Sequence, residues 1–187
     1  MLEKDATLID VAFAVCTVLD AAGKCAVLTG GSAATYYAPA AYQSLDADFI
    51  LQFGVTRKVV DPALAAIGYH RTPYGMYAHE AIPFTVEFPA GPLRIGRDVV
   101  TEWRTDHRND QLLHVLTPTD SARDRFIAYY AWSDYSALLA AVAVARTQAK
   151  DFDRKRFEHW ARAEARADSA YDPARLDTFF ALLAHRD

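Results

Sequence analysis

Two aspartates one residue apart stand at the start of a very hydrophobic segment, LDADFILQF, residues 45–53. Alternate side chains of a β-strand point to the same face, so Asp46 and Asp48 are expected to face the same way. Flexible carboxylates rooted about 7 Å apart can converge on one cation. Without a cation, the like charges raise one pKa and cost stability. Oxygen ligands of this kind suit Mg²⁺ or Mn²⁺.

A third acid, Glu87, lies in the stretch IPFTVEFPAGP, residues 82–92, among apolar neighbours where a lone carboxylate is costly to desolvate. If this stretch forms a strand beside residues 46–53, Glu87 completes a three-carboxylate site. Such a site can hold two metal ions about 4 Å apart, one activating an attacking hydroxyl and the other holding a triphosphate. Taken alone, Glu87 is more typical of an edge-strand acid paired with Arg94 or Arg97.

The corner Gly30-Gly31-Ser32 follows a short apolar run and precedes a stretch that can open a helix. Glycines at such a corner let phosphate oxygens approach the backbone, and a helix N-terminus offers N–H groups with a partial positive charge. Ser32 adds a hydroxyl donor. Taken alone, a glycine pair is more often a tight turn, and Asp-x-Asp is often a solvated strand end. The prediction of a phosphate and metal site therefore rests on the order and spacing of all these residues together.

Hydrophobic periodicity and turn residues define the elements that must position these groups. The first part of the chain is predicted to form helices over 5–21, 32–37 and 58–67 and strands over 26–29, 47–53, 75–78, 83–88 and 112–116. From Pro118 onward, helices are predicted over 119–130, 133–148, 153–167 and 173–184. We therefore expect an α+β protein, with a small mixed sheet flanked by helices over residues 1–116 and a helical bundle over residues 117–187.

Composition excludes some classes of protein. The chain has 187 residues, 52% of them hydrophobic and 24% charged, which is enough to bury a core in one or two domains. Residues 1–115 carry 9 Lys and Arg against 13 Asp and Glu, a net of −4, whereas residues 116–187 carry 11 of each. The acidic first part repels a nucleotide unless cations or the later arginines compensate. Apolar runs fall short of the roughly 18 residues of a membrane span, so a cytoplasmic protein without a membrane partner is expected.

The order Gly-Gly-Ser, spacer, Asp-x-Asp and later acid resembles the nucleotidyltransferase superfamily that includes DNA polymerase beta. Within it, TGGSAATYYAPAAYQSLDADFIL, residues 29–51, resembles the AbiEii-type group of toxin/antitoxin nucleotidyltransferases and related small bacterial proteins. The stretch TPTDSARDRFIAYYAWSDYSAL, residues 117–138, resembles a helical segment of that group. Arg125 stands where the group usually has a lysine that faces the nucleotide, and Asp134 stands at the position of an acid about nine residues later. The spacer of fourteen residues between Gly31 and Asp46 is longer than the commonest form.

The resemblance implies a metal-dependent enzyme that transfers a nucleoside monophosphate from an NTP to RNA or tRNA, a protein or a small molecule. It also implies a place in a toxin/antitoxin system, with an antitoxin as partner. The roles it implies are metal binding by Asp46, Asp48 and Glu87 and nucleotide binding by Gly30, Gly31, Ser32, Arg125 and Asp134. The metal is expected to be Mg²⁺ or Mn²⁺.

Two alternatives stay open. The chain is also compatible with a catalytically inactive protein of the same fold that binds a nucleotide or a regulatory partner, or with an antitoxin-like interaction module. The arginine at 125 and the acidic first part favour the inactive form. Metal-independent NTP binding without product would distinguish it from an enzyme.

Aromatic residues of the helical part are expected to form its core. Phe152, Phe157 and Trp160 fall broadly on one side of the helix over 153–167, with a charged face that includes Lys155 on the other. That charged face could hold the backbone of an RNA acceptor. Trp132 is expected to pack the joint between two helices.

Overall fold

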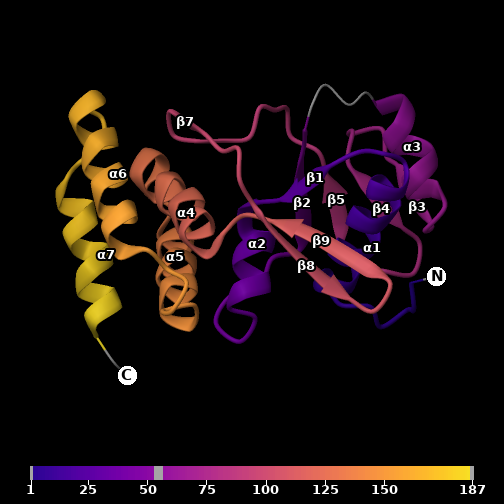
Figure 1. Ribbon diagram of the computed structural model, residues 1–187, viewed down its shortest axis with the longest axis horizontal. Helices are drawn as coiled ribbons and strands as arrows, with labels where there is room; N and C mark the ends of the chain where they lie inside the picture. Colours follow the sequence, from indigo (N-terminus) through magenta and orange to yellow (C-terminus); the bar gives the residue numbers. More distant parts are fainter. Residues whose placement is uncertain (1, 53–56, 186–187) are drawn as a thin grey trace.

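The protein is an α+β structure, described by a computed structural model over residues 2–52 and 57–185 (Figure 1). Its helices in these ranges are α1 Leu8–Ala21, α2 Gly30–Tyr37, α3 Arg57–Ala65, α4 Pro118–Trp132, α5 Tyr135–Thr147, α6 Arg154–Ala167 and α7 Ala174–Ala184. Its strands there are β1 Ala26–Leu28, β2 Asp46–Leu51, β3 Tyr69–Arg71, β4 Tyr77–His79, β5 Thr85–Glu87, β6 Arg94–Ile95, β7 Asp98–Val99, β8 Arg104–Arg108 and β9 Gln111–Val115. Phe53, the end of one predicted strand, lies outside the described residues.

The main sheet is mixed, as the sequence predicts, and within the described chain its strand order is β3-β4-β5-β2-β1-β9-β8. Strand β2 pairs in parallel with β5 and antiparallel with β1, and β1 pairs in parallel with β9. The remaining strands of this sheet pair antiparallel. This order places β2, which carries the two aspartates, in the interior of the sheet.

Local sequence accounts for the helices that border the sheet. Helix α1 begins at a capping box, in which Thr7 and Asp10 each accept a backbone N–H of the other. Its buried face includes Val11, Val15 and Leu19, and it packs against β9. Helix α2 follows β1 after a single residue, Thr29, so Gly30 is the first residue of the helix.

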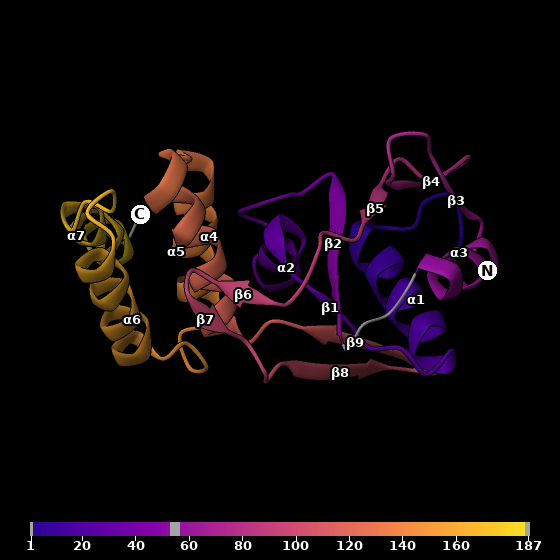
Figure 2. The same ribbon diagram turned by 90° about the horizontal axis from the view of Figure 1, so that it is seen from above.

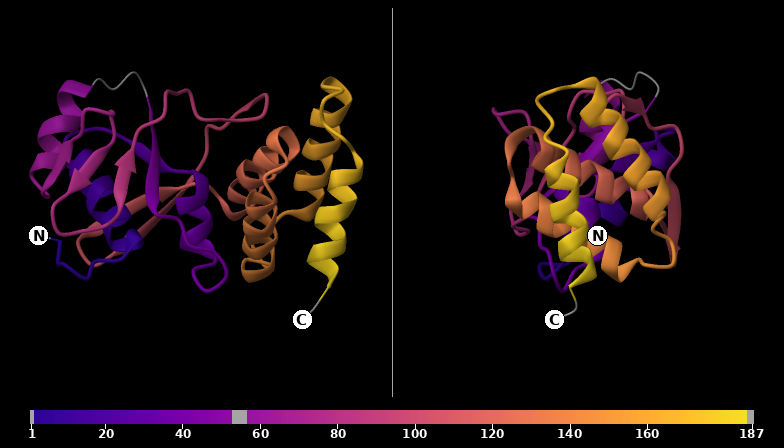
Figure 3. Two further views of the ribbon diagram at one scale, coloured as in Figure 1. Left: turned by 180° about the vertical axis from the view of Figure 1, so that it is seen from behind. Right: turned by 90° about the vertical axis from the view of Figure 1, so that its left-hand side faces the viewer.

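The four C-terminal helices lie together on one side of the sheet (Figures 2 and 3). Helix α4 packs against α5, and both contact α2. Aromatic rings hold the outer helices in place: Phe126 of α4 lies 5.2 Å from Phe157 of α6 and 5.5 Å from Phe179 of α7, centroid to centroid. The core-facing stripe predicted for α6 is confirmed, since Phe157 and Trp160 are buried.

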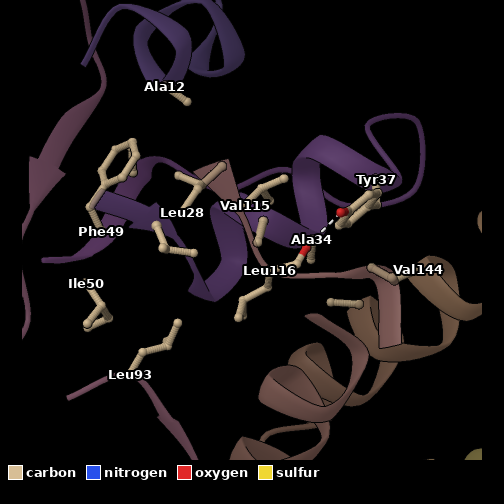
Figure 4. Packing of buried hydrophobic residues seen from close by; sticks show 14 of the residues in the cluster. Ala12, Leu28, Ala34, Tyr37, Phe49, Ile50, Leu93, Val115, Leu116 and Val144 are labelled. Carbon is tan, nitrogen blue, oxygen red and sulfur yellow. Dashed lines mark hydrogen bonds between the residues drawn. The ribbon is translucent and has the colours of Figure 1, made fainter. Parts of the chain in front are cut away.

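A shared core joins the sheet to the helices. The Tyr37 hydroxyl at the end of α2 donates a hydrogen bond of 2.7 Å to the Leu116 carbonyl, and the Thr147 hydroxyl of α5 donates to the Tyr37 carbonyl at 3.0 Å (Figure 4). Buried side chains continue on both sides of this contact, including Ala34, Leu116 and Val144. The division into two domains at residue 116 stays a prediction.

The structure also differs from the sequence-based expectations. Strands β3, β6, β7 and β8 were not predicted, because each is short or, in the case of β8 with the sequence RTDHR, almost wholly polar. The expectation for Trp132 is wrong: its side chain is 78% exposed at the end of α4 and does not fill the joint. Among the described residues, no helix is long and apolar enough to cross a membrane.

Candidate active site

Three acidic residues meet on neighbouring strands of the sheet. In the parallel pair β2 and β5, Asp46 lies opposite Thr85 and Asp48 lies opposite Glu87. Paired residues of adjacent strands share a face, and so do alternate residues of one strand. Asp46, Asp48 and Glu87 therefore share one face of the sheet. The edge-strand interpretation of Glu87 does not apply, because β5 lies between β4 and β2.

Asp48 is the electrostatic centre of this group. Burial raises the pKa of its carboxyl to about 6, and the charges of Asp46 and Glu87 add to the rise, while the Arg125 guanidinium opposes it. Both neighbouring acids are thus close enough to Asp48 to oppose its ionisation. A cation between them would replace repulsion by attraction.

The donor set suits a hard divalent ion by its chemistry, because it consists of carboxylate oxygens held on a rigid sheet. Its side chains are not gathered around one point: across residues 2–52 and 57–185, no three His, Cys, Asp or Glu side chains are arranged to hold an ion together. Asp46 accepts a hydrogen bond of 2.8 Å from the Ser44 hydroxyl. Metal binding by all three acids therefore requires their carboxylates to move closer together.

The glycine corner lies directly against Asp48. Gly30 has φ of 64°, and a Cβ atom there would lie 2.4 Å from Asp48 Oδ2. The position therefore requires glycine both for its left-handed backbone and for space. A Cβ at Gly31 would lie 2.9 Å from Ser44 Oγ and 3.0 Å from the Tyr42 hydroxyl. The corner is thus enclosed by β2 and the loop that leads into it.

Ser32 ties the corner to the sheet. Its fully buried hydroxyl donates to the Thr29 carbonyl at 2.7 Å and accepts from the Asp48 N–H at 3.2 Å. The Thr29 N–H in turn donates to the Asp48 carbonyl at 2.9 Å. These bonds fix the distance between the corner and the acids and already use the hydroxyl proton of Ser32. A contact of Ser32 with a nucleotide stays a prediction.

A fourth acid, Asp124 of α4, occupies the corner. Its Oδ2 accepts the Gly30 N–H at 3.1 Å, and it also accepts from Nε and a terminal nitrogen of Arg125 at 3.2 and 2.9 Å. Sequence reasoning missed Asp124 because its partner at the corner lies 94 residues earlier in the chain. Its position beside Arg125 in the sequence was the only signal. The carboxylate stands where the sequence analysis expects a phosphate.

Arg125 is brought to the site, whereas Asp134 is placed differently. Asp124 and Asp48 raise the pKa of the Arg125 guanidinium, while burial acts against them as the largest single influence. Asp134 is an exposed N-cap of α5, and its carboxylate accepts the Ala137 N–H at 3.1 Å. Capping accounts for Asp134, and its part in nucleotide binding stays a prediction.

Comparisons with known proteins add little to this picture. No family model and no curated protein matches the chain. A solved structure that resembles it is the solution structure of the antibiotic-resistance factor ANT(2'')-Ia, a protein with substrate-regulated conformation dynamics. The two chains share 14% sequence identity with a TM-score of 0.43, over 85% of this chain and 96% of that one. The functional interpretation rests on the geometry of the site.

Proposed function

We propose that the protein is a metal-dependent nucleotidyltransferase that moves a nucleoside monophosphate from an NTP to an acceptor. The observation that carries the proposal is the meeting of Asp46, Asp48 and Glu87 on one face of the sheet, directly beside the corner formed by Gly30 and Gly31. Acids next to an anion-binding corner are expected where divalent ions bridge carboxylates and phosphates.

In the proposed reaction, the acceptor oxygen attacks the α-phosphorus of the NTP, and the bond from that phosphorus to the pyrophosphate oxygen breaks. Pyrophosphate leaves with the bonding electrons. Asp46, Asp48 and Glu87 would hold divalent ions, which supply a lower pKa for the attacking hydroxyl and neutralise the triphosphate. Glu87, in register with Asp48, would help to activate the acceptor by taking the proton that it loses. The first N–H groups of α2 and the Arg125 guanidinium would hold the triphosphate.

Asp124 gives the proposal a consequence for binding. A triphosphate and the Asp124 carboxylate seek the same donors, the Gly30 N–H and Arg125. A nucleotide that binds at the corner must therefore displace Asp124. This competition favours one alternative function, a protein of the same architecture that binds nucleotides or a regulatory partner without chemistry.

The finer assignments belong to the same proposal. The acceptor is RNA or tRNA, a protein or a small molecule. A role as the toxin of a toxin/antitoxin pair, with an antitoxin partner, follows from the AbiEii-type resemblance alone.

To test for catalysis, the wild-type protein is to be incubated with labelled NTPs, Mg²⁺ and either total RNA or cell lysate. An Asp46→Ala/Asp48→Ala double variant, checked for folding by circular dichroism, is the control.

We expect a labelled acceptor with the wild type and none with the double variant. Equal labelling by the two proteins, or none by either, would contradict the catalytic proposal. Calorimetry with NTP then tests the alternative: tight binding without Mg²⁺ and without product supports a nucleotide-binding protein without catalytic activity.

A further inference from the structure

A cavity of about 610 Å³ lies between the β6–β7 hairpin and α6, and none of its lining residues belongs to the candidate active site. The β6–β7 hairpin lies on the side of the sheet that faces the C-terminal helices (Figure 2). Arg97 of its turn donates to the Ala163 carbonyl of α6 at 3.3 Å and lies 3.7 Å from a Glu164 oxygen. The polar or charged side chains that line the cavity are Arg97, Asp98, Arg123, Lys155, Arg156, His159, Trp160 and Glu164.

The wall of this cavity contains a buried arginine stacked on a buried tryptophan. Arg123 is 2% exposed and Trp160 is 4% exposed, and the guanidinium carbon lies 4.6 Å from the ring centroid. The terminal nitrogens of Arg123 donate to Asp120 at 2.7 Å and to Asp98. Arg123 Nε and Trp160 Nε1 have no hydrogen-bond partner within the described part of the chain. Both atoms are fully buried, so they shape the wall and do not themselves contact a ligand in the cavity.

The rim of the cavity is cationic. Lys155 and His159 are four residues apart on α6, so they face the same way, and both are exposed. Arg156 also lines the cavity while it donates to Asp120 at 3.0 Å. Four Lys and Arg side chains line the cavity against two Asp and Glu side chains, and Asp120, which pairs with Arg123 and Arg156 behind the lining, brings the net to +1 with His159 neutral. The whole chain has a net charge of −4, so the positive cavity stands out against an acidic protein.

We infer that this cavity binds a phosphate-bearing small molecule. The exposed guanidinium groups of Arg97 and Arg156 lie on the same lining as Lys155 and His159, and guanidinium groups match the geometry of a phosphate. A volume of about 610 Å³ suits a small molecule rather than a polymer. The inference does not depend on the proposed enzymatic function, because none of its residues belongs to the glycine corner or the acidic face.

Binding is to be measured by calorimetry in metal-free buffer with three probes: inorganic phosphate, pyrophosphate and a nucleoside monophosphate. We expect saturable binding of at least one probe, about tenfold weaker in Lys155→Glu, because one charge-assisted contact is lost and a like charge is added. Lys150→Glu is the matched control, an exposed charge reversal outside the cavity lining, and should leave the affinity within about twofold. The probe that binds most tightly separates a free phosphate ligand from a phosphorylated metabolite.

A local readout comes from the indole N–H resonance of Trp160, assigned with Trp103→Phe and Trp132→Phe variants. We expect the bound probe to shift this resonance and to leave that of Trp132 in place. No binding up to about 10 mM, or equal weakening by Lys155→Glu and Lys150→Glu, would overturn the inference. So would binding that Arg125→Gln abolishes and Lys155→Glu preserves, because the anion would then lie at the glycine corner.

Discussion

At the scale of single residues, Asp48 is held in an unfavourable state. It lies between Asp46 and Glu87 and against the glycine corner, and its pKa is raised to about 6. The ordinary value for aspartate is 3.8. Between about pH 4 and pH 6 the metal-free folded protein keeps a proton that the unfolded chain has released. Its stability therefore falls as pH rises through this window and levels off above it.

The first prediction follows from that sign. Asp48→Asn removes the ionisable group, so the metal-free variant should gain on the order of 2 kcal/mol relative to wild type at pH 7 and little at pH 4. Urea unfolding in the presence of a chelator at the two pH values measures this difference. Asp110→Asn, in the exposed turn between β8 and β9, is the matched control, and it should change the free energy of unfolding by the same small amount at both pH values. A variant that is less stable than wild type at pH 7 would argue against the buried charge.

Asp124 carries the second prediction. Asp124→Asn keeps an oxygen that can accept the Gly30 N–H but removes the charge that neutralises Arg125. A phosphate then meets less competition, so NTP affinity measured by calorimetry should rise about three- to tenfold. Asp110→Asn again serves as the control for loss of one negative charge. A fall in NTP affinity in Asp124→Asn would mean that the carboxylate helps to bind the nucleotide.

At the scale of elements, the turn from β1 to α2 gives a matched pair of glycines. Gly30 and Gly23 have φ of 64° and 70°, but a Cβ at Gly23 meets nothing within 4 Å, whereas one at Gly30 meets Asp48. Gly23→Ala should cost about 1 kcal/mol, the penalty for the left-handed backbone alone. Gly30→Ala should cost at least about 2 kcal/mol more, because it adds a clash in the core. Urea unfolding measures both. An equal loss of stability in the two variants would show that the corner can accommodate a methyl group without a clash.

The capping residues and the strand pattern also explain which parts of the fold and the site could be predicted from the sequence. Helices α4, α5 and α6 begin directly after the capping residues Thr117, Asp134 and Asp153, so their starts could be predicted within a few residues. The shared face of Asp46 and Asp48 follows from strand alternation. The register of Asp48 with Glu87 could only be assumed, because strand pairing depends on the whole sheet.

Contacts between elements that lie far apart in the sequence could not be predicted. The Gly30 contact of Asp124 depends on how α4 packs against α2, and no local pattern encodes it. The cavity beside α6 depends on the β6–β7 hairpin, whose strands have two residues each and no clear periodicity. Lys155 alone gave a hint, as part of a charged helix face.

At the scale of the whole molecule, the fold brings an acidic sheet face and an arginine of the helical part to the same place. The acids come from β2 and β5, the corner comes from the start of α2, and Arg125 comes from α4, which packs on α2. Helices and strands thus hold the backbone of the site. A ligand that binds the folded arrangement and not the unfolded chain stabilises the whole protein.

Divalent ions should therefore raise the melting temperature of the wild-type protein. With Mn²⁺ or Mg²⁺ at about ten times its dissociation constant, the gain is about 1.4 kcal/mol, which corresponds to a few degrees for a chain of this size. The melting temperature of the Asp46→Ala/Asp48→Ala variant should not rise, because the remaining Glu87 cannot hold an ion alone. A melt with Ca²⁺ at equal ionic strength shows whether the site selects a small ion. Thermal melts at pH 7 measure the shift. An equal shift in the double variant would place the ion elsewhere and remove the metal from the proposed reaction.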